Sequence, residues 1–93
     1  MNNKTETQQI EQPIREFIAN NLLYSPDGFT YPDDASFLRE SIVDSLGVVE
    51  LVEFVQKNFG VKVGQHEVTP DNFDSVAKLA AFVRRKQGEN ARA

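Results

Sequence analysis

Hydrophobic residues recur at helical spacing in three segments of the chain. In the middle segment, the apolar residues that share one side of a helix drawn at about 100° per residue are Val48, Leu51, Val52, Val55 and Phe59. Asp44 can cap the start of this helix, because a short carboxylate accepts free backbone N–H groups, and Gly60 suits the left-handed residue that ends one. The pattern therefore predicts a helix over residues 45–59.

Two further helices are predicted on either side of the middle one. The first, over residues 9–23, rests on Ile10, Ile14, Phe17, Ile18 and Leu22. Pro13 is compatible with it only in the first turn, where its missing N–H costs nothing. The last, over residues 74–87, rests on Val76, Leu79, Ala80 and Val83, with Asp74 as its cap and Gly88 near its end.

A long first loop, residues 24–43, joins the first two helices. Ser25-Pro26-Asp27-Gly28 predicts a turn within it, and Tyr31-Pro32 favours extended backbone. We expect a short helical turn after that, capped by Asp33 or Asp34, which carries Phe37 and Leu38 inward. Long loops in compact domains are often functional, and this one delivers the chain to Ser45.

The second connection contains short apolar stretches. Val61 and Val63 alternate with Lys62 as in a strand, but a lone strand has no partner, so we expect an extended segment. Residues 65–69 are predicted to form one short helical turn, and Phe73 to anchor the chain in the core. With disordered tails at 1–9 and 88–93, the fold predicted for residues 10–87 is an all-α bundle of three main helices and one short one.

The face of the middle helix opposite its apolar stripe combines aliphatic and charged side chains. Leu46 and Val49 lie there among Glu50, Glu53, Gln56 and Lys57. Scattered exposed aliphatic residues are common. An apolar pair rimmed by carboxylates, next to a serine at the start of the helix, nevertheless favours a docking surface.

Ser45 is predicted to be the first residue of the middle helix. Free N–H groups and the positive end of the helix dipole favour an anion at that position, so a phosphodiester on Ser45 would be well placed. The same local pattern recurs at Asp74-Ser75 without the apolar and acidic face beside it. An Asp-Ser pair alone therefore does not define a site.

Composition narrows the classes of function. The chain has 93 residues, a net charge of −4 and no cysteine, so any thiol chemistry must come from a bound group. Residues 33–74 carry nine Asp and Glu against three Lys and Arg, a balance of −6 that would attract a basic partner and argues against nucleic acid. The sequence has no apolar run long enough to span a membrane, so we expect a protein of the cytoplasm.

No set of residues with the spacing of a catalytic site is present. His66 is the only histidine, and it lies in a polar stretch without a nucleophile at a recognisable distance. The paired carboxylates Asp33-Asp34 and Glu50/Glu53 are more typical of solvated faces. The sequence thus predicts no catalytic residues, no metal site and no enzyme activity.

The whole run Asp44-Ser45-Leu46-Gly47-Val48-Val49-Glu50-Leu51-Val52 resembles the 4′-phosphopantetheine attachment motif of acyl carrier proteins. The resemblance extends over residues 10–87, including Phe59-Gly60-Val61-Lys62-Val63 and Thr69-Pro70-Asp71-Asn72-Phe73. It implies a monomeric carrier that holds an acyl or aminoacyl group as a thioester on an arm attached to Ser45, with Asp44 beside it and Leu46, Val49, Glu50 and Glu53 as the docking face. The implied partners are a phosphopantetheinyl transferase, a loading ligase or transferase, and the acyl-processing enzymes of fatty-acid, lipid or secondary-metabolite biosynthesis.

Two departures from the motif favour a stand-alone specialised carrier. Gly47 replaces the acidic or polar residue usual in carriers of fatty-acid synthesis, and Ser41-Ile42-Val43 replaces their usual approach to the Asp-Ser pair. Glycine lowers helix stability, so its presence at residue 47 needs a reason. Either a partner's surface or another helix of the bundle approaches closely there, or the first turn simply tolerates a glycine. The alternative function is an interaction module that docks through Leu46 and Val49 with Ser45 unmodified.

Overall fold

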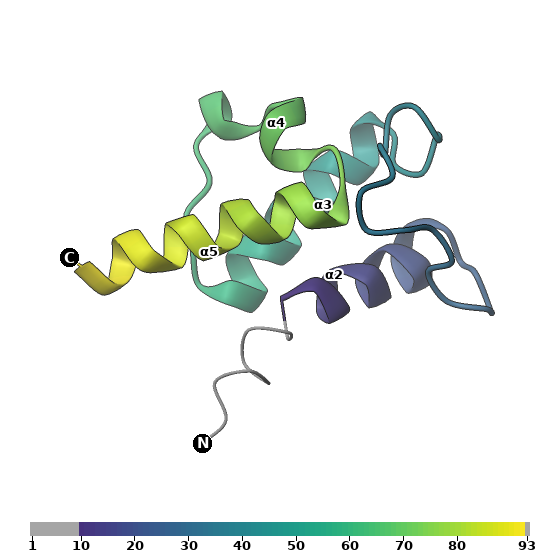
Figure 1. The fold of residues 1–93 in the computed structure, drawn as a ribbon, viewed down its shortest axis with the longest axis horizontal. Helices are drawn as coiled ribbons and strands as arrows, with labels where there is room; N and C mark the ends of the chain where they lie inside the picture. Colours follow the sequence, from purple (N-terminus) through teal and green to yellow (C-terminus); the bar gives the residue numbers. More distant parts are fainter. Residues whose placement is uncertain (1–9, 93) are drawn as a thin grey trace, which may run out of the picture.

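The computed structural model describes residues 10–92, and the regular elements in this range are all helical (Figure 1). In chain order they are α2 (Glu11–Phe17), the π-helix η1 (Ile18–Leu22), α3 (Ser45–Phe59), the 3₁₀-helix η2 (Gln65–Glu67), α4 (Pro70–Phe73) and α5 (Val76–Arg92). The predicted all-α bundle is confirmed. The disordered tail predicted at residues 1–9 lies outside the described residues.

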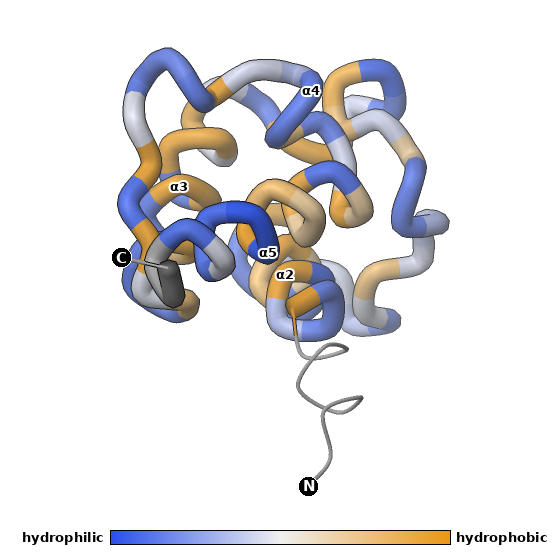
Figure 2. The backbone as a smooth tube through the Cα atoms, turned by 60° about the vertical axis from the view of Figure 1, so that its left-hand side comes forward, coloured by the Kyte–Doolittle hydropathy of each residue, from blue (hydrophilic) through white to orange (hydrophobic). Residues whose placement is uncertain are grey.

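Helix α5 is the central element of the bundle. It contacts α2, α3 and α4, which lie around it in Figure 1. The largest of the fully buried side chains come from α2, η1, α3 and α5: Ile14, Ile18, Leu51, Val55, Val76, Leu79, Phe82 and Val83. Figure 2 shows the hydrophobic stretches of α2 and α5 meeting in the middle of the molecule. The apolar stripes predicted from the sequence therefore face one shared core.

Helix α3 begins and ends at the predicted residues. Asp44 has extended backbone, and its Oδ1 accepts a hydrogen bond from the Gly47 N–H at 2.8 Å. Gly60 adopts the left-handed conformation, with φ of 67°, and its N–H donates to the carbonyl of Gln56 at 3.0 Å. Both ends are fixed by local capping interactions, which is why the sequence was sufficient to predict them.

The first predicted helix is divided into an α-helix and a π-helix. After Phe17 the chain widens, and the Leu23 N–H donates to the carbonyl of Ile18, five residues back, at 2.9 Å. The next residue, Tyr24, has a positive φ of 53° and ends the helical segment. The prediction of one regular helix to residue 23 was wrong in this last turn, and its predicted start at residue 9 lies outside the described residues.

Helix α5 differs from its predicted form at both ends. It begins at Val76, and Ser75 caps it, because its Oγ accepts a hydrogen bond from the Lys78 N–H at 3.0 Å. Asp74 is not the cap, since its carboxylate binds Ser36 and Leu38 of the long loop. The helix continues through Gly88 to Arg92. Gly88 does not have a positive φ, and therefore it does not form a left-handed stop.

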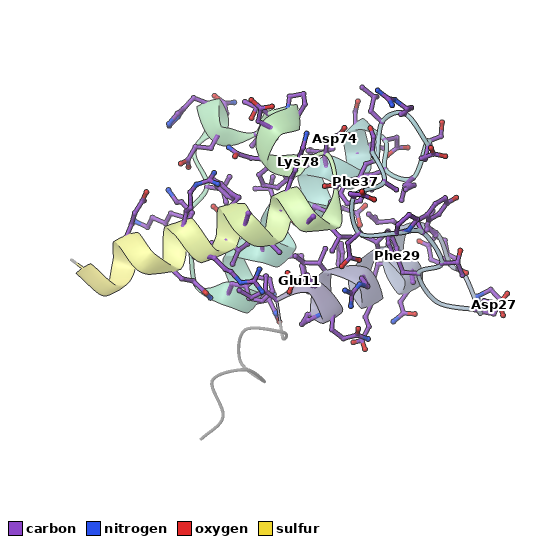
Figure 3. All side chains as sticks on the ribbon, in the orientation of Figure 1. Glu11, Asp27, Phe29, Phe37, Asp74 and Lys78 are labelled. Carbon is purple, nitrogen blue, oxygen red and sulfur yellow. The ribbon has the colours of Figure 1, made fainter. Side chains whose placement is uncertain are left out.

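The long loop is fastened to the start of α5. The carbonyl of Asp33 accepts from the Ala77 N–H at 2.9 Å, and the Phe37 N–H donates to the carbonyl of Asp74 at 2.7 Å. Figure 3 shows Phe37 and Asp74 next to each other where the loop meets this end of α5. The loop is thus held in place just before it reaches α3.

One turn of helix-like backbone follows in this loop, as predicted, but with a different cap. The Glu40 N–H donates to the carbonyl of Ser36, and the Ser36 Oγ accepts from the Arg39 N–H at 3.0 Å. Ser36 caps this turn, whereas Asp33 pairs with Arg15 of α2. The prediction that Phe37 and Leu38 both point inward was half wrong. Phe37 is 2% exposed, whereas Leu38 is 76% exposed, since successive residues of such a turn cannot share one face.

The second connection agrees with the sequence in all but one element. Residues 61–63 form no strand, and Val61 is buried within an extended segment. The short helical turn predicted at residues 65–69 is present as η2. Helix α4, in which Pro70 occupies the first position, was not predicted, although Phe73 is buried at 4% exposure, as expected of an anchor. No helix in the described part of the chain has the length and apolar character needed to cross a membrane.

Candidate functional site

The start of α3 presents Ser45 at the surface of the bundle. Ser45 is exposed and follows the capping residue Asp44, whose carboxylate is turned toward the Gly47 N–H. The N–H groups of the first turn have no carbonyl partner within their own helix and point out of its end. The hydroxyl of Ser45 therefore lies where the helix dipole favours an attached anion.

The two Asp-Ser pairs of the sequence have different environments. Ser75 is 2% exposed, and its Oγ is engaged by the Lys78 N–H, whereas Ser45 is exposed. An enzyme can approach the hydroxyl of Ser45 but not that of Ser75. Sequence alone could not separate the two pairs by exposure, because this depends on how the loop and α4 cover the start of α5.

An apolar cavity of about 360 Å³ opens beside Ser45. Its walls come from the end of the long loop, the first turns of α3 and the residues around α4, and include Phe37, Val48, Val68 and Phe73. This volume is at the lower end of the range for small-molecule sites. The cavity was not predicted, because its walls are brought together from three separated segments.

Asp74 fixes one wall of this cavity. The hydroxyl of Ser36 donates to its Oδ2 at 2.5 Å and the Leu38 N–H donates to its Oδ1 at 3.0 Å. Partial burial by itself would raise the pKa of Asp74, but the hydrogen bonds from Ser36 and Leu38 outweigh it, and Lys78 and Arg39 add to them, so the pKa lies below its usual value. The carboxylate is therefore ionised at neutral pH and holds the loop against α4 and α5.

The predicted docking residues all lie on the solvent side of α3. Leu46 is 74% exposed and Val49 is 56% exposed, and Glu50 and Glu53 are exposed beside them. Sequence reasoning missed two other exposed hydrophobic side chains near Ser45. These are Leu38, on the wall of the cavity described above, and Tyr24, which is 78% exposed.

Gly47 is buried by other parts of the same chain. A Cβ atom at this position would lie 2.8 Å from Cγ1 of Val43 and 3.4 Å from Cδ1 of Leu22. The end of the first helical segment and the end of the long loop therefore both approach α3 at this glycine. Of the two close approaches considered for Gly47, the intramolecular one is present, and this explains why the residue has no side chain.

Comparison with known proteins finds acyl carrier proteins among the relatives of this chain. The chain is 34% identical over 79 residues to an acyl carrier protein of Akkermansia muciniphila, a match that covers 85% of this chain and 94% of that protein. It is 38% identical over 45 residues to the probable acyl carrier protein PigG of a Serratia species, covering 48% of this chain and 52% of that protein. No protein-family profile matches.

A solved structure resembles the fold as well. A chain in a structure described as “Crystal structure of FAD-dependent dehydrogenase” superposes with a TM-score of 0.63 and 35% identity, over 74% of this chain and 96% of that one. The bundle and its relatives thus define a small helical carrier protein, which is not an enzyme. The chain belongs to the acyl carrier protein family.

Proposed function

We propose that Ser45 is the attachment site for 4′-phosphopantetheine, and that the protein carries an acyl or aminoacyl group on this arm between the enzymes of a biosynthetic pathway. The observation that carries the proposal is the exposure of Ser45 at the start of α3, beside an apolar cavity, in a chain of this family. The bound arm would supply the thiol that forms a thioester with the cargo, since the chain has no cysteine of its own.

The residues around Ser45 fit such a group. Its hydroxyl is accessible, and the first turn of α3 offers N–H groups and the positive end of the helix dipole to a phosphodiester. In the attachment reaction, Ser45 Oγ would form a bond to the phosphorus that bears the pantetheine of coenzyme A, the pyrophosphate bond would break, and adenosine 3′,5′-bisphosphate would leave. A base of the transferase would take the hydroxyl proton.

The cavity at Ser45 would shelter the apolar part of the cargo. Val48 and Phe73 line it, and Asp74 holds the Ser36–Leu38 segment in place as one of its walls. A carried group would leave water when it enters this cavity, which favours a cargo with an apolar portion. The departure at Gly47 supports a carrier dedicated to one pathway. An acidic side chain at this position would require the Val43 side chain or the neighbouring backbone to shift, because a Cβ there would lie 2.8 Å from Cγ1 of Val43.

The partners would comprise a phosphopantetheinyl transferase, a ligase or transferase that loads the cargo, and acyl-processing enzymes. The similarity to a chain from the FAD-dependent dehydrogenase structure supports a flavin enzyme among the last group. Such an enzyme would oxidise the carried group by moving a hydride to its flavin and a proton to a base. Bleaching of the flavin on mixing with the loaded protein would test this partner.

The attachment is tested by mass spectrometry. The protein is incubated with coenzyme A and a broad-specificity phosphopantetheinyl transferase, weighed intact, and then digested to locate the adduct. We expect one arm on Ser45, none on Ser45→Ala, and an unchanged yield on Ser75→Ala if that variant folds. An unchanged mass of the wild-type protein, or an adduct on Ser75, would exclude the proposal.

The second candidate function is an interaction module with Ser45 unmodified. The exposed pair Leu46 and Val49 is the observation in its favour, because the pair would bury well against a partner. Under this alternative, the wild-type protein would remain unmodified in the experiment above.

A further inference from the structure

A second cavity, of about 350 Å³, lies on the other flank of the α3 N-terminus. Its lining includes Tyr24 at the end of the first helical segment, Ser41 at the end of the long loop, the capping residue Asp44, and Leu46 and Glu50 of α3. We call it the Tyr24 groove. Asp44 lines both this groove and the cavity described above, so Ser45 stands between the two.

Backbone strain is concentrated around this groove. The described residues other than glycine that have positive φ are Tyr24, at 53°, and Ser41, at 56°, and both line it. The π-helix η1 ends just before Tyr24. A positive φ is uncommon for any residue with a side chain and is a genuine outlier for a bulky one, and such strain clusters at functional sites.

The ring of Tyr24 lies largely in solvent, so packing in the core does not account for this strain. The chain reverses around Tyr24, and the Ser25 N–H donates to the carbonyl of Ala19 at 2.8 Å. Glycine or asparagine would be favoured at the position of Tyr24, because it ends a helical segment with a positive φ. Yet an aromatic side chain occupies it and is 78% exposed. Exposed tyrosines of this kind are typical anchors at protein interfaces.

The electrostatics of the groove indicate which partner it fits. Among the described residues that line it, the charged ones are Asp44 and Glu50, both acidic and both exposed. Any enzyme that reaches the Ser45 hydroxyl must cover the adjacent Asp44 and Leu46. A transferase that binds the phosphates of coenzyme A carries basic residues around its active site, and these complement the two carboxylates.

We propose that the Tyr24 groove is the docking site for the phosphopantetheinyl transferase. An apolar side chain of the enzyme enters between Tyr24 and Leu46, and a basic one pairs with Glu50. This inference rests on the proposed attachment at Ser45 and adds to it a specificity determinant outside α3. The predicted docking face of α3 continues into the groove through Leu46.

The test compares the steady-state kinetics of arm attachment in matched variants. Tyr24→Asn removes the ring and keeps a residue that tolerates positive φ, so the fold is retained or stabilised. Tyr24→Phe keeps the aromatic ring and removes only the hydroxyl. Tyr31→Asn makes the same kind of change in the same loop, at an exposed tyrosine that lines neither cavity. Circular dichroism and thermal unfolding verify that each variant is folded.

We expect Tyr24→Asn to raise the KM for the carrier protein about tenfold with little change in kcat, whereas Tyr24→Phe and Tyr31→Asn keep the wild-type KM. Glu50→Lys should raise KM at low salt and less at high salt. A wild-type KM for Tyr24→Asn, with Ser45 modified normally, would overturn the docking site and leave the carrier function standing. A wild-type protein that accepts no arm would overturn both.

Discussion

Arg15 and Asp33 form a bidentate ion pair that fastens the long loop to α2. Nε of Arg15 donates to Oδ1 of Asp33 at 2.7 Å, and Nη2 donates to Oδ2 at 2.5 Å. The hydrogen bond from Arg15 holds the pKa of Asp33 below its usual value, against a smaller opposing effect of burial. The position of the loop that leads to Ser45 thus depends on an ion pair between two residues that are 18 positions apart in the sequence.

This pair should make stability depend on pH in the acidic range. Because the pKa of Asp33 is lower in the folded state, its contribution is fully present above about pH 4 and is lost as the pH falls through the lowered value. Both side chains remain about a third exposed, so solvent screening limits the loss in Asp33→Asn to roughly 0.5–1 kcal/mol at neutral pH.

Urea unfolding at pH 7 and at pH 3 checks this prediction. The difference between Asp33→Asn and the wild type should shrink at the lower pH and at high salt. Asp34→Asn is the matched control, since it makes the same change at the neighbouring carboxylate. An equal effect of the two substitutions, or a difference that does not depend on pH, would contradict the role of the pair.

Asp74, in the wall of the Ser45 cavity, should contribute more than Asp33 to the free energy of unfolding. Asp74→Ala removes the acceptor of the Ser36 hydroxyl and the Leu38 N–H and loosens the loop, which keeps its backbone hydrogen bonds to the start of α5. We expect a loss of about 1–2 kcal/mol in the free energy of unfolding, because hydrogen bonds to a charged group are involved. Ser36→Ala leaves the Leu38 contact in place and should lose less.

Loosening the wall can be measured separately from global stability. Hydrogen exchange at the amides of Phe37 and Leu38, which bind the carbonyl and the carboxylate of Asp74, should become faster in Asp74→Ala. The amide of Gly60, at the far end of α3, should keep its protection. Unchanged exchange at Phe37 and Leu38 would show that Asp74 does not hold this segment.

The sequence predicted the parts of the fold that depend on local interactions. Helix α3 is right at both ends because Asp44 and Gly60 act within one turn of the helix. The assignment of Asp74 as a cap failed because its partner Ser36 is 38 residues away, and Ser75 took its place. The exposure of Leu38 and the cavity at Ser45 likewise depend on packing between distant segments, which periodicity does not describe.

Glycine was an ambiguous signal for the same reason. Gly60 and Gly88 each lie near the end of a helix predicted from its apolar stripe, and a Cβ at either would meet nothing within 4 Å. They differ in backbone conformation, since Gly60 has a φ of 67° and Gly88 lies inside α5 without a positive φ. Composition near a helix end therefore indicates where it can stop, and the tertiary fold decides whether it does.

These two glycines should respond oppositely to the same substitution. Gly88→Ala should stabilise α5 by about 0.5–1 kcal/mol, because alanine loses less backbone entropy in a helix. Gly60→Ala should destabilise the protein by about 1 kcal/mol, because an L-residue is strained in the left-handed conformation. Thermal unfolding of both variants checks the pair, and a change of the same sign in both would contradict the different roles of the two residues.

Substitution of Gly47 should lower stability for a different reason, because here a new side chain would collide with neighbouring atoms. A Cβ would lie 2.8 Å from Cγ1 of Val43, a contact so short that the Val43 side chain or the backbone of one of the two segments must move. We expect Gly47→Ala to destabilise the protein by about 1–2 kcal/mol despite the better helix propensity of alanine. Gly47→Asp should cost more, because it also places a second carboxylate beside Oδ1 of Asp44, 3.4 Å from the position of its Cβ.

A double-mutant cycle of Gly47→Ala with Val43→Ala isolates this contact. Removing Cγ1 of Val43 creates the space that the new methyl group needs, so the two substitutions together should cost at least about 0.5 kcal/mol less than the sum of their separate effects. Leu22→Ala serves as a second partner with a longer contact of 3.4 Å and should show weaker coupling. Additive effects at Val43 would mean that the glycine is only tolerated in the first turn of α3. In that case the departure from the usual carrier motif at Gly47 would carry no packing requirement, and Gly47→Asp would be a harmless way to test the choice of partner enzymes.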